Sequence, residues 1–319
     1  MRRLSCLASA LTIVASLVGW SVPMTAAETG NLDQLRQKAL ELVNEERQEL
    51  GLEPLSLGPA LNEAAQSHAQ DMLQRNYYAH TSPQGNTVAD RYSKAGGSRW
   101  HMTAENIARC QGCPSPLTEE SVANLHRGWM NSPPHRENIL RRGLDRFGFG
   151  IIAAPNQALY AVQTFAGAGT PREMQPGGAS IVTGADDQTA LALQQINRER
   201  HDNGRGPLEA DPTLARAASR LAPQTDQDMS NFDLQGRLSA VLPADAPRNW
   251  QSLAAVLGRC GGCGMEPTEG DIRHFVGQWL EDPGYRSRLL SRDFTHFGLA
   301  LETNGDGLKT ASAVLGQRR

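Results

Sequence analysis

The spacing of apolar residues predicts two helices at the start of the first half of the chain. From residue 32 to residue 50, apolar side chains recur at three- and four-residue steps, at Leu32, Leu35, Ala39, Leu40, Val43 and Leu50. Gly51 follows and can end this helix. A second stretch with the same period runs from about residue 60 to residue 73.

A third helical pattern precedes a pair of prolines. The apolar residues between 122 and 129 keep the helical period, and Thr118 can cap the N-terminus of this helix. Pro133 and Pro134 cannot donate a backbone hydrogen bond, so they end it. We therefore expect His135 just beyond a helix end, where its side chain can face a cleft.

Strands are predicted late in each half of the chain. Residues 147–153 and 158–165 are predicted to pair around a Pro155-Asn156 turn, and Asn304-Gly305 marks the turn of a similar hairpin in the second half of the chain. Because helices come first, strands come late and strict βαβ alternation is missing, the pattern indicates the α+β class.

The chain contains two copies of one pattern. IARCQGC at 107–113 returns as LGRCGGC at 257–263, a spacing of 150 residues. The same spacing relates Trp100 to Trp250, Trp129 to Trp279, and RFGFGII (146–152) to HFGLALE (296–302). LVNEERQELG resembles QINRERHDNG, 153 residues later. We predict a first domain at 28–170, a Pro- and Gly-rich linker or strap at 171–187, and a second domain at 188–319.

An export signal is predicted at the N-terminus. Arg2 and Arg3 precede an apolar run from residue 7 to residue 18, and small residues follow up to Ala27. This run is too short to cross a membrane comfortably, and no later segment is apolar enough. We expect a signal peptide at 1–27, a mature protein without a membrane span, and a secreted or periplasmic location.

The net charge and the length of the chain bear on the type of partner and on the number of domains. Removal of residues 1–27 lowers Lys+Arg from 31 to 29 against 34 Asp+Glu, so the mature net charge is −5. No cluster of Lys and Arg is present, which argues against a nucleic-acid partner. The remaining 292 residues suit two domains better than one core.

Three segments in a fixed order resemble one protein family. They are YYAHTSPQG with His80, TAENIARC with Glu105, and WMNSPPHRENIL with His135. Together they resemble the short bacterial branch of the CAP superfamily (cysteine-rich secretory, antigen-five and pathogenesis-related proteins), over roughly residues 35–167. The resemblance implies two tandem α–β–α sandwiches. It also implies that His80, Glu105 and His135 share one cleft, lined further by Asn106, Trp129 and Ser132.

These residues could support metal binding or catalysis. Two neutral imidazoles, His80 and His135, can bind a zinc ion, while Glu105 orients an imidazole or acts as a general base. The sequence departs from the family pattern at Ser132, where a second acidic residue is expected, and at Ala104, where glycine is usual. The missing carboxylate weakens both a metal site and acid–base catalysis. The alternative is a hydrogen-bonded network that holds loops together.

A serine hydrolase is the less favoured chemistry. Ser132 lies three residues before His135, but the sequence has no GxSxG nucleophile motif. We expect Ser132 to cap the turn at the two prolines instead.

The second copy lacks the ionisable cluster. Ala255 stands at the position of Glu105, Tyr285 stands at that of His135, and residues 226–232 contain no histidine. We predict a degenerate domain that packs, binds or regulates.

Three other histidines are poorer candidates for the site. His68 lies on an apolar helix face and His126 corresponds to Val276, which favours packing for both. His101 adjoins Trp100 and could line the same cleft, but it corresponds to Gln251.

Four cysteines remain after signal removal, which allows three disulfide connectivities. Cys110 and Cys113 form one CxxC pair, and Cys260 and Cys263 form the other. Export favours a local disulfide within each pair. Cross-domain bonds, a four-cysteine zinc site and a redox function are weaker alternatives.

The function we expect is binding of a small or lipid-like ligand, or of an envelope or extracellular partner, through the first-domain cleft. The first alternative is a metal-assisted hydrolase that uses His80, Glu105 and His135. The second is a purely structural interaction module. Whether the protein is an enzyme stays open, and zinc is the one cofactor considered.

Overall fold

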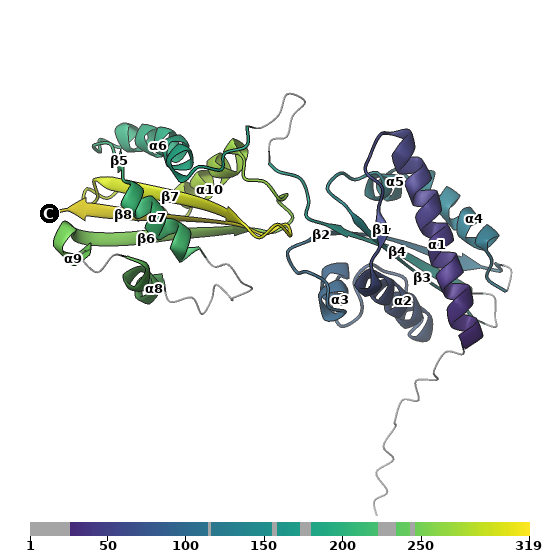
Figure 1. The fold of residues 1–319 in the computed structure, drawn as a ribbon. Coiled ribbons are helices and arrows are strands. Elements are labelled where there is room, and N and C mark those ends of the chain that lie inside the picture. Colours follow the sequence, from purple (N-terminus) through teal and green to yellow (C-terminus); the bar gives the residue numbers. More distant parts are fainter. Residues whose placement is uncertain (1–25, 114–115, 155–157, 173–179, 223–233, 243–245) are drawn as a thin grey trace, which may run out of the picture.

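The chain folds into two domains of the same type (Figure 1). The computed structural model describes residues 26–113, 116–154, 158–172, 180–222, 234–242 and 246–319. Each domain has a four-stranded sheet, in the orders β1-β3-β4-β2 and β5-β7-β8-β6. Helices cover both faces of each sheet. The predicted α+β class with two tandem α–β–α sandwiches is therefore confirmed.

The first domain contains five helices and four strands within the described residues. In order they are α1 (Ala26–Glu49), β1 (Ser56–Leu57), α2 (Pro59–Gln74), α3 (Val88–Lys94), β2 (Met102–Gln111), α4 (Glu119–Met130), α5 (Pro133–Ile139), β3 (Arg146–Ala153) and β4 (Ala158–Gly167).

The second domain repeats this order in its described part, with one additional short helix, α9, before its first long strand. Its elements are α6 (Ala185–Asp202), β5 (Glu209–Ala210), α7 (Pro212–Leu221), α8 (Leu234–Val241), α9 (Ala246–Asn249), β6 (Trp250–Cys260), α10 (Glu269–Glu281), α11 (Pro283–Leu289), β7 (His296–Thr303) and β8 (Lys309–Arg318). No helix in the described part of the chain is long and apolar enough to cross a membrane.

Successive residues of strand β3 face opposite sides of the first-domain sheet, and each side packs against a different helix. Phe147 and Phe149 are buried in the cluster that includes α1 residues, and Gly148 and Gly150 face the opposite way, onto α2. A Cβ atom on Gly148 would lie 2.3 Å from the Leu61 carbonyl carbon. Glycine at this position lets helix and strand approach closely.

A buried arginine joins distant parts of each domain. Arg47 at the end of α1 donates to the carbonyl oxygens of Glu53, Ile139 and Arg141, at 2.9–3.0 Å. Arg200 does the same in the second domain, with Gly206, Leu289 and Ser291 as acceptors. The repeated arginine thus ties the first helix of each copy to the end of α5 in the first domain and of α11 in the second.

The two prolines end one helix and begin another. Helix α4 stops at Met130, as the sequence predicts, but Pro133 opens α5, because a proline lacks the N–H that the first helical position leaves unpaired anyway. His135 therefore lies in the first turn of a helix. Ser132 is the N-cap residue, but its hydroxyl makes no capping hydrogen bond, so the capping role predicted for it is wrong.

Two predicted boundaries lie partly outside the described residues. Of the expected signal peptide, 1–25 are not described, and α1 already includes Ala26 and Ala27. Of the expected linker, 173–179 are not described. The signal peptide and the domain limits remain predictions.

Residues 180–182, here called the strap, lie extended against the second domain. Ile181 forms an antiparallel bridge with Thr268. Helix α6 then begins at Ala185.

The disulfide loop of the second domain docks onto the first. Gly262, inside the Cys260–Cys263 loop, donates its N–H to the carbonyl oxygen of Trp100 at 2.7 Å. Gly264 donates to the carbonyl oxygen of Ala168 at 2.8 Å. These backbone contacts bring the ends of β2 and β4 against β6.

We predict that Gly169→Ala separates the domains. Gly169 has φ +81°, and a Cβ atom there would lie 1.9 Å from the carbonyl oxygen of Gly262, so the docked loop has no room for it. Small-angle scattering should show a larger radius of gyration. Gly112→Ala is the control, because its φ of +76° carries the same backbone strain with no neighbouring atom within 4 Å. An unchanged scattering profile for folded Gly169→Ala would contradict the expected separation.

Candidate functional site

A buried carboxylate lies at the centre of the predicted cleft. Glu105 on β2 is 5% exposed. One of its oxygens, Oε1, lies 2.9 Å from Nδ1 of His80, and the other, Oε2, accepts a hydrogen bond from Nη2 of Arg91 at 2.6 Å. A carboxylate removed from water needs hydrogen-bond and charge partners, and Arg91 supplies both.

Arg91 also fixes the loop that carries His80. Its guanidinium donates to the carbonyl oxygens of His80 at 3.1 Å and Asn86 at 2.9 Å. It lies on α3, whose N-terminus is closed by a capping box of Thr87 and Asp90. Our sequence analysis missed this helix, although the T-x-x-D spacing of the capping box is a signal that could have revealed its start.

A buried amide network places His135. Asn106 donates to the carbonyl oxygen of His135 at 3.1 Å and to Gln163 at 3.0 Å, and it accepts from Asn138 at 3.0 Å. Asn106 is 0% exposed, so the prediction that it lines the cleft is wrong. It holds α5 against β2 instead. Burial, and then the charge of His80, lower the pKa of His135 below its ordinary value, so this ring is neutral near neutral pH.

The donor atoms do not fit a zinc centre. Among the described residues, no three side chains of the types His, Cys, Asp and Glu are grouped so that they could hold a metal ion. Both oxygens of Glu105 are engaged, by His80 and Arg91. His80 and His135 alone would leave a metal short of the three or four protein ligands that zinc usually takes.

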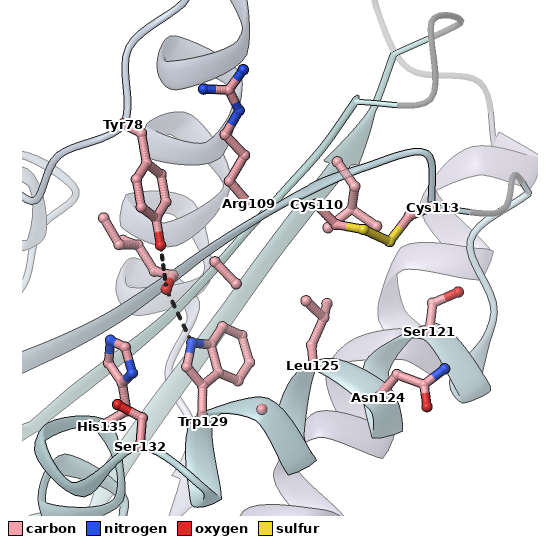
Figure 2. Close-up of a pocket in the computed structure, with 14 residues that line it drawn as sticks. Tyr78, Arg109, Cys110, Cys113, Ser121, Asn124, Leu125, Trp129, Ser132 and His135 are labelled. Atoms are coloured by element: carbon pink, nitrogen blue, oxygen red, sulfur yellow. Dashed lines mark hydrogen bonds between the residues drawn. A yellow bond between two sulfur atoms is a disulfide. The ribbon is translucent and has the colours of Figure 1, made fainter.

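An apolar cavity of about 440 Å³ opens beside His135. Figure 2 shows His135 and Ser132 at one end and the Cys110–Cys113 disulfide at the other. The walls between them include Ile107, Leu125, Trp129 and Leu159. Trp129 and Ser132, both predicted to line the cleft, lie on this cavity.

One carbonyl group organises the cavity wall. The hydroxyl of Tyr78 and Nε1 of Trp129 both donate to the carbonyl oxygen of Ile107, at 3.0 and 3.1 Å (Figure 2). Because β2 is an edge strand of its sheet, its outward carbonyl groups are available to these side chains.

A family model described as "CAP: Cysteine-rich secretory protein family" matches residues 40–165 and 193–315. The chain belongs to the CAP family. The two matched stretches correspond to the two domains of the fold, which confirms the resemblance and the tandem arrangement.

Three relatives in sequence or structure each match less than half of this chain. YkwD of Bacillus subtilis is 35% identical over 128 residues, or 40% of this chain and 46% of YkwD. An extracellular SCP-domain protein of Bacillus anthracis is 27% identical over 46% of this chain and 44% of its own, with a TM-score of 0.35. An outer surface protein of Borrelia burgdorferi is 22% identical over 43% of this chain and 92% of its own, with a TM-score of 0.35. The chain spans less than half the length of the B. subtilis relatives it matches.

The second CAP domain carries larger side chains where the first has its cavity. Phe275 replaces Leu125, and Gly258 replaces Ala108. The two second-domain residues are in close contact, because a Cβ atom on Gly258 would lie 2.7 Å from Cδ1 of Phe275. Phe275 is fully buried in the second-domain core.

The second domain also replaces the polar cluster. Ala255 stands in place of Glu105, and Nη1 of Arg288 donates to its carbonyl oxygen at 2.8 Å, as Asn138 does to Glu105 at 3.2 Å. The segment 226–232, predicted to lack a histidine equivalent to His80, lies outside the described residues.

Both disulfides are local, as favoured from the sequence. Cys110 pairs with Cys113, and Cys260 pairs with Cys263. The alternatives of cross-domain bonds and a four-cysteine zinc site are wrong, because each sulfur is bonded within its own loop.

Two of the remaining histidines make polar contacts with other parts of the chain. Nε2 of His68 lies 3.0 Å from the carbonyl oxygen of Ala79, and burial lowers its pKa. Nε2 of His101 lies 2.5 Å from a carboxylate oxygen of Asp306 in the second domain.

A third histidine is buried with no hydrogen bond. His126 on α4 is 4% exposed, and neither ring nitrogen has a hydrogen-bond partner among the described residues. Its nearest charged group is Glu46 on α1, at 3.7 Å. Burial lowers the pKa of His126 to about 4, against the weaker raising effect of Glu45.

We predict that His126 makes the fold sensitive to acid. Between pH 6.5 and 4 the unfolded chain protonates this histidine and the folded chain does not, so stability falls as the pH falls. His126→Val, which copies Val276 of the second domain, should lose about 2.5 kcal/mol less than the wild type between pH 7.5 and 4.5. Urea unfolding at both pH values measures this difference. Equal losses in the two proteins would contradict the assignment.

Proposed function

We propose that the protein is an exported binding protein whose first CAP domain takes a small amphipathic ligand into the cavity beside His135. The observation that carries this proposal is an apolar cavity of about 440 Å³ with two polar side chains at one end. Within the described residues, neither the ring of His135 nor the hydroxyl of Ser132 has a hydrogen-bond partner. Both are therefore available to a ligand.

The lining determines the chemistry that would be recognised. The volume lies in the range of small-molecule sites, which combine apolar walls with a few convergent polar groups. An apolar body would lie against Leu125, Trp129 and Leu159. A neutral imidazole both donates and accepts hydrogen bonds, so His135 suits a carboxyl, hydroxyl or amide group.

Export is supported by sequence and covalent structure together. Arg2 and Arg3, the apolar run from 7 to 18, and the small residues before 28 form a signal-peptide pattern. Two disulfides are expected in proteins that reach an oxidising compartment.

The second domain provides a template for closing the cavity. In Ala108→Gly/Leu125→Phe, both residues become those of the second copy, and the glycine gives the new ring the room that Gly258 gives Phe275. We expect binding of a dansyl-labelled medium-chain fatty acid, followed by its fluorescence, to weaken by at least about tenfold.

The matched control is the reverse change in the second domain. Phe275→Leu alters the same position of the fold but leaves the first-domain cavity intact, so binding should equal that of the wild type. Wild-type binding by the filled double variant would reject the cavity as the ligand site.

A second candidate function is hydrolysis with His80 as general base. The carboxylate of Glu105 orients Nδ1 of His80, while the side chain remains 56% exposed and leaves Nε2 free to take a proton from water. A carboxylate that orients an imidazole is the arrangement that such catalysis needs.

We predict, on this second candidate, that His80→Ala lowers hydrolysis of an activated ester by at least about tenfold. The control is His201→Ala, because that side chain is 90% exposed and distant in sequence from the cluster. If both variants hydrolyse the ester as the wild type does, His80 is no general base and binding is the remaining function.

A further inference from the structure

The strap occupies a defined binding position on the second domain. Val182 donates its N–H to the carbonyl oxygen of Pro267 at 3.0 Å, and the carbonyl oxygen of Ser180 accepts from the N–H of Glu269 at 3.2 Å. The pairing follows the pattern of a short antiparallel strand added to the start of α10.

The strap also places an aliphatic side chain in the core. Val182 is buried and belongs to the apolar cluster that includes Cys260, Cys263 and Phe275. Gln188 holds it from the other side, because Nε2 donates to the carbonyl oxygen of Val182 at 2.8 Å. A backbone pairing and a buried aliphatic residue therefore act together.

The first domain presents the same backbone surface without a strap. Leu117, Thr118 and Glu119 correspond to Pro267, Thr268 and Glu269, and Thr118 caps α4 through a capping box as Thr268 caps α10. In the described part of the chain, neither the carbonyl group of Leu117 nor the N–H of Glu119 has a hydrogen-bond partner. Their second-domain counterparts are the groups that bind the strap.

The first helix explains why this surface has no strap of its own. The offset between α1 and α6 is 153 residues, so residues 27–29 correspond to the strap. They are helical, because α1 extends back to Ala26 whereas α6 begins only at Ala185. The described chain therefore supplies an extended segment to the second domain and none to the first.

The apolar part of this position continues into the cavity. The Cys110–Cys113 disulfide and Leu125 line the cavity of the first domain, and they correspond to Cys260–Cys263 and Phe275, which share a cluster with Val182. An extended segment on Leu117–Glu119 would thus direct a side chain toward the disulfide end of the cavity.

The charges beside this surface define the segment further. Glu119 and Glu120 are both exposed, and within the described residues neither forms an ion pair. A partner with a basic residue at this point would gain from them, whereas an acidic partner would be repelled.

We propose that the first domain binds an extended peptide of a partner protein. The peptide pairs antiparallel with Leu117–Glu119, as the strap pairs with Pro267–Glu269. It places an aliphatic side chain in the cavity and a basic residue beside Glu119 and Glu120. This inference rests on the proposed function, because it names a peptide as the amphipathic ligand of the same cavity.

The test uses the full oxidised protein and a labelled synthetic peptide, Lys-Ala-Ser-Ile-Val-Thr-Gly-Lys, which embeds the sequence of residues 179–184 between two lysines. Glu119→Pro removes the N–H that the peptide would use. The helix tolerates it, since Glu119 is the first helical residue and Thr118 already has extended backbone, φ −129° and ψ 167°. We expect fluorescence anisotropy to show binding weakened by about tenfold, the loss of one hydrogen bond.

Two control variants show whether weaker peptide binding comes from the lost N–H of Glu119, from the lost carboxylate, or from the second domain. Glu119→Ala removes the same carboxylate but keeps the N–H, so it should weaken binding by only about twofold to fivefold. Glu269→Pro disturbs the strap and leaves the first domain unchanged, so it should bind the peptide as the wild type does. Circular dichroism confirms that each variant is folded.

Each outcome decides between the two proposals. Equal affinity of Glu119→Pro and Glu119→Ala, or an effect seen only with Glu269→Pro, would overturn peptide pairing on the first domain. No peptide binding by the wild type, with fatty-acid binding still lost in Ala108→Gly/Leu125→Phe, would reject the peptide and keep the cavity as a small-ligand site. Failure of both probes would reject both.

Discussion

A buried guanidinium with no carboxylate beside it holds each CAP domain in shape. Arg47 donates to three backbone carbonyl groups and Arg200 to four. These carbonyl groups lie in the loop after the first helix of each domain and at or beyond the end of α5 or α11. A neutral side chain would leave these acceptors unsatisfied away from water, which is costly. In the first domain this contact fixes the end of α5, and α5 carries His135. The position of the candidate site therefore depends on an arginine that does not touch it.

The two copies keep this frame and differ in what they place on it. Both retain the arginine, a tryptophan that donates to β2 or β6, and a local disulfide. Glu105 with its guanidinium partner is found in the first copy, while Ala255 and the backbone contact of Arg288 take its place in the second. The cavity follows the same division, since Phe275 occupies the second copy's position for Leu125. Framework and chemistry have thus diverged separately.

Much of this arrangement could be predicted from local sequence. The helical periods of α1, α2 and α4, the hairpin of β3 and β4, and the local disulfides all come from short-range patterns. Strand β2 was not predicted from the sequence. Residues 104–107 are all buried, so polar and apolar positions do not alternate along this strand. The polar contacts were harder still. Nothing next to Arg91 in the sequence indicates that its charge reaches Glu105, and Asn106 looks like a cleft residue until its amide is seen to bond to α5.

The contact between the two domains requires a form of the disulfide loop that the second domain has and the first lacks. The loop that contacts the first domain has Gly261, where a Cβ atom would already lie 3.2 Å from the carbonyl oxygen of Trp100. The equivalent residue of the first domain is Gln111. If a copy of the first domain stood in place of the second, the side chain of this glutamine would clash with the backbone of Trp100. Because Gly261 has no side chain, the second domain can dock in this way and the first cannot. The two domains are therefore not interchangeable in the interface.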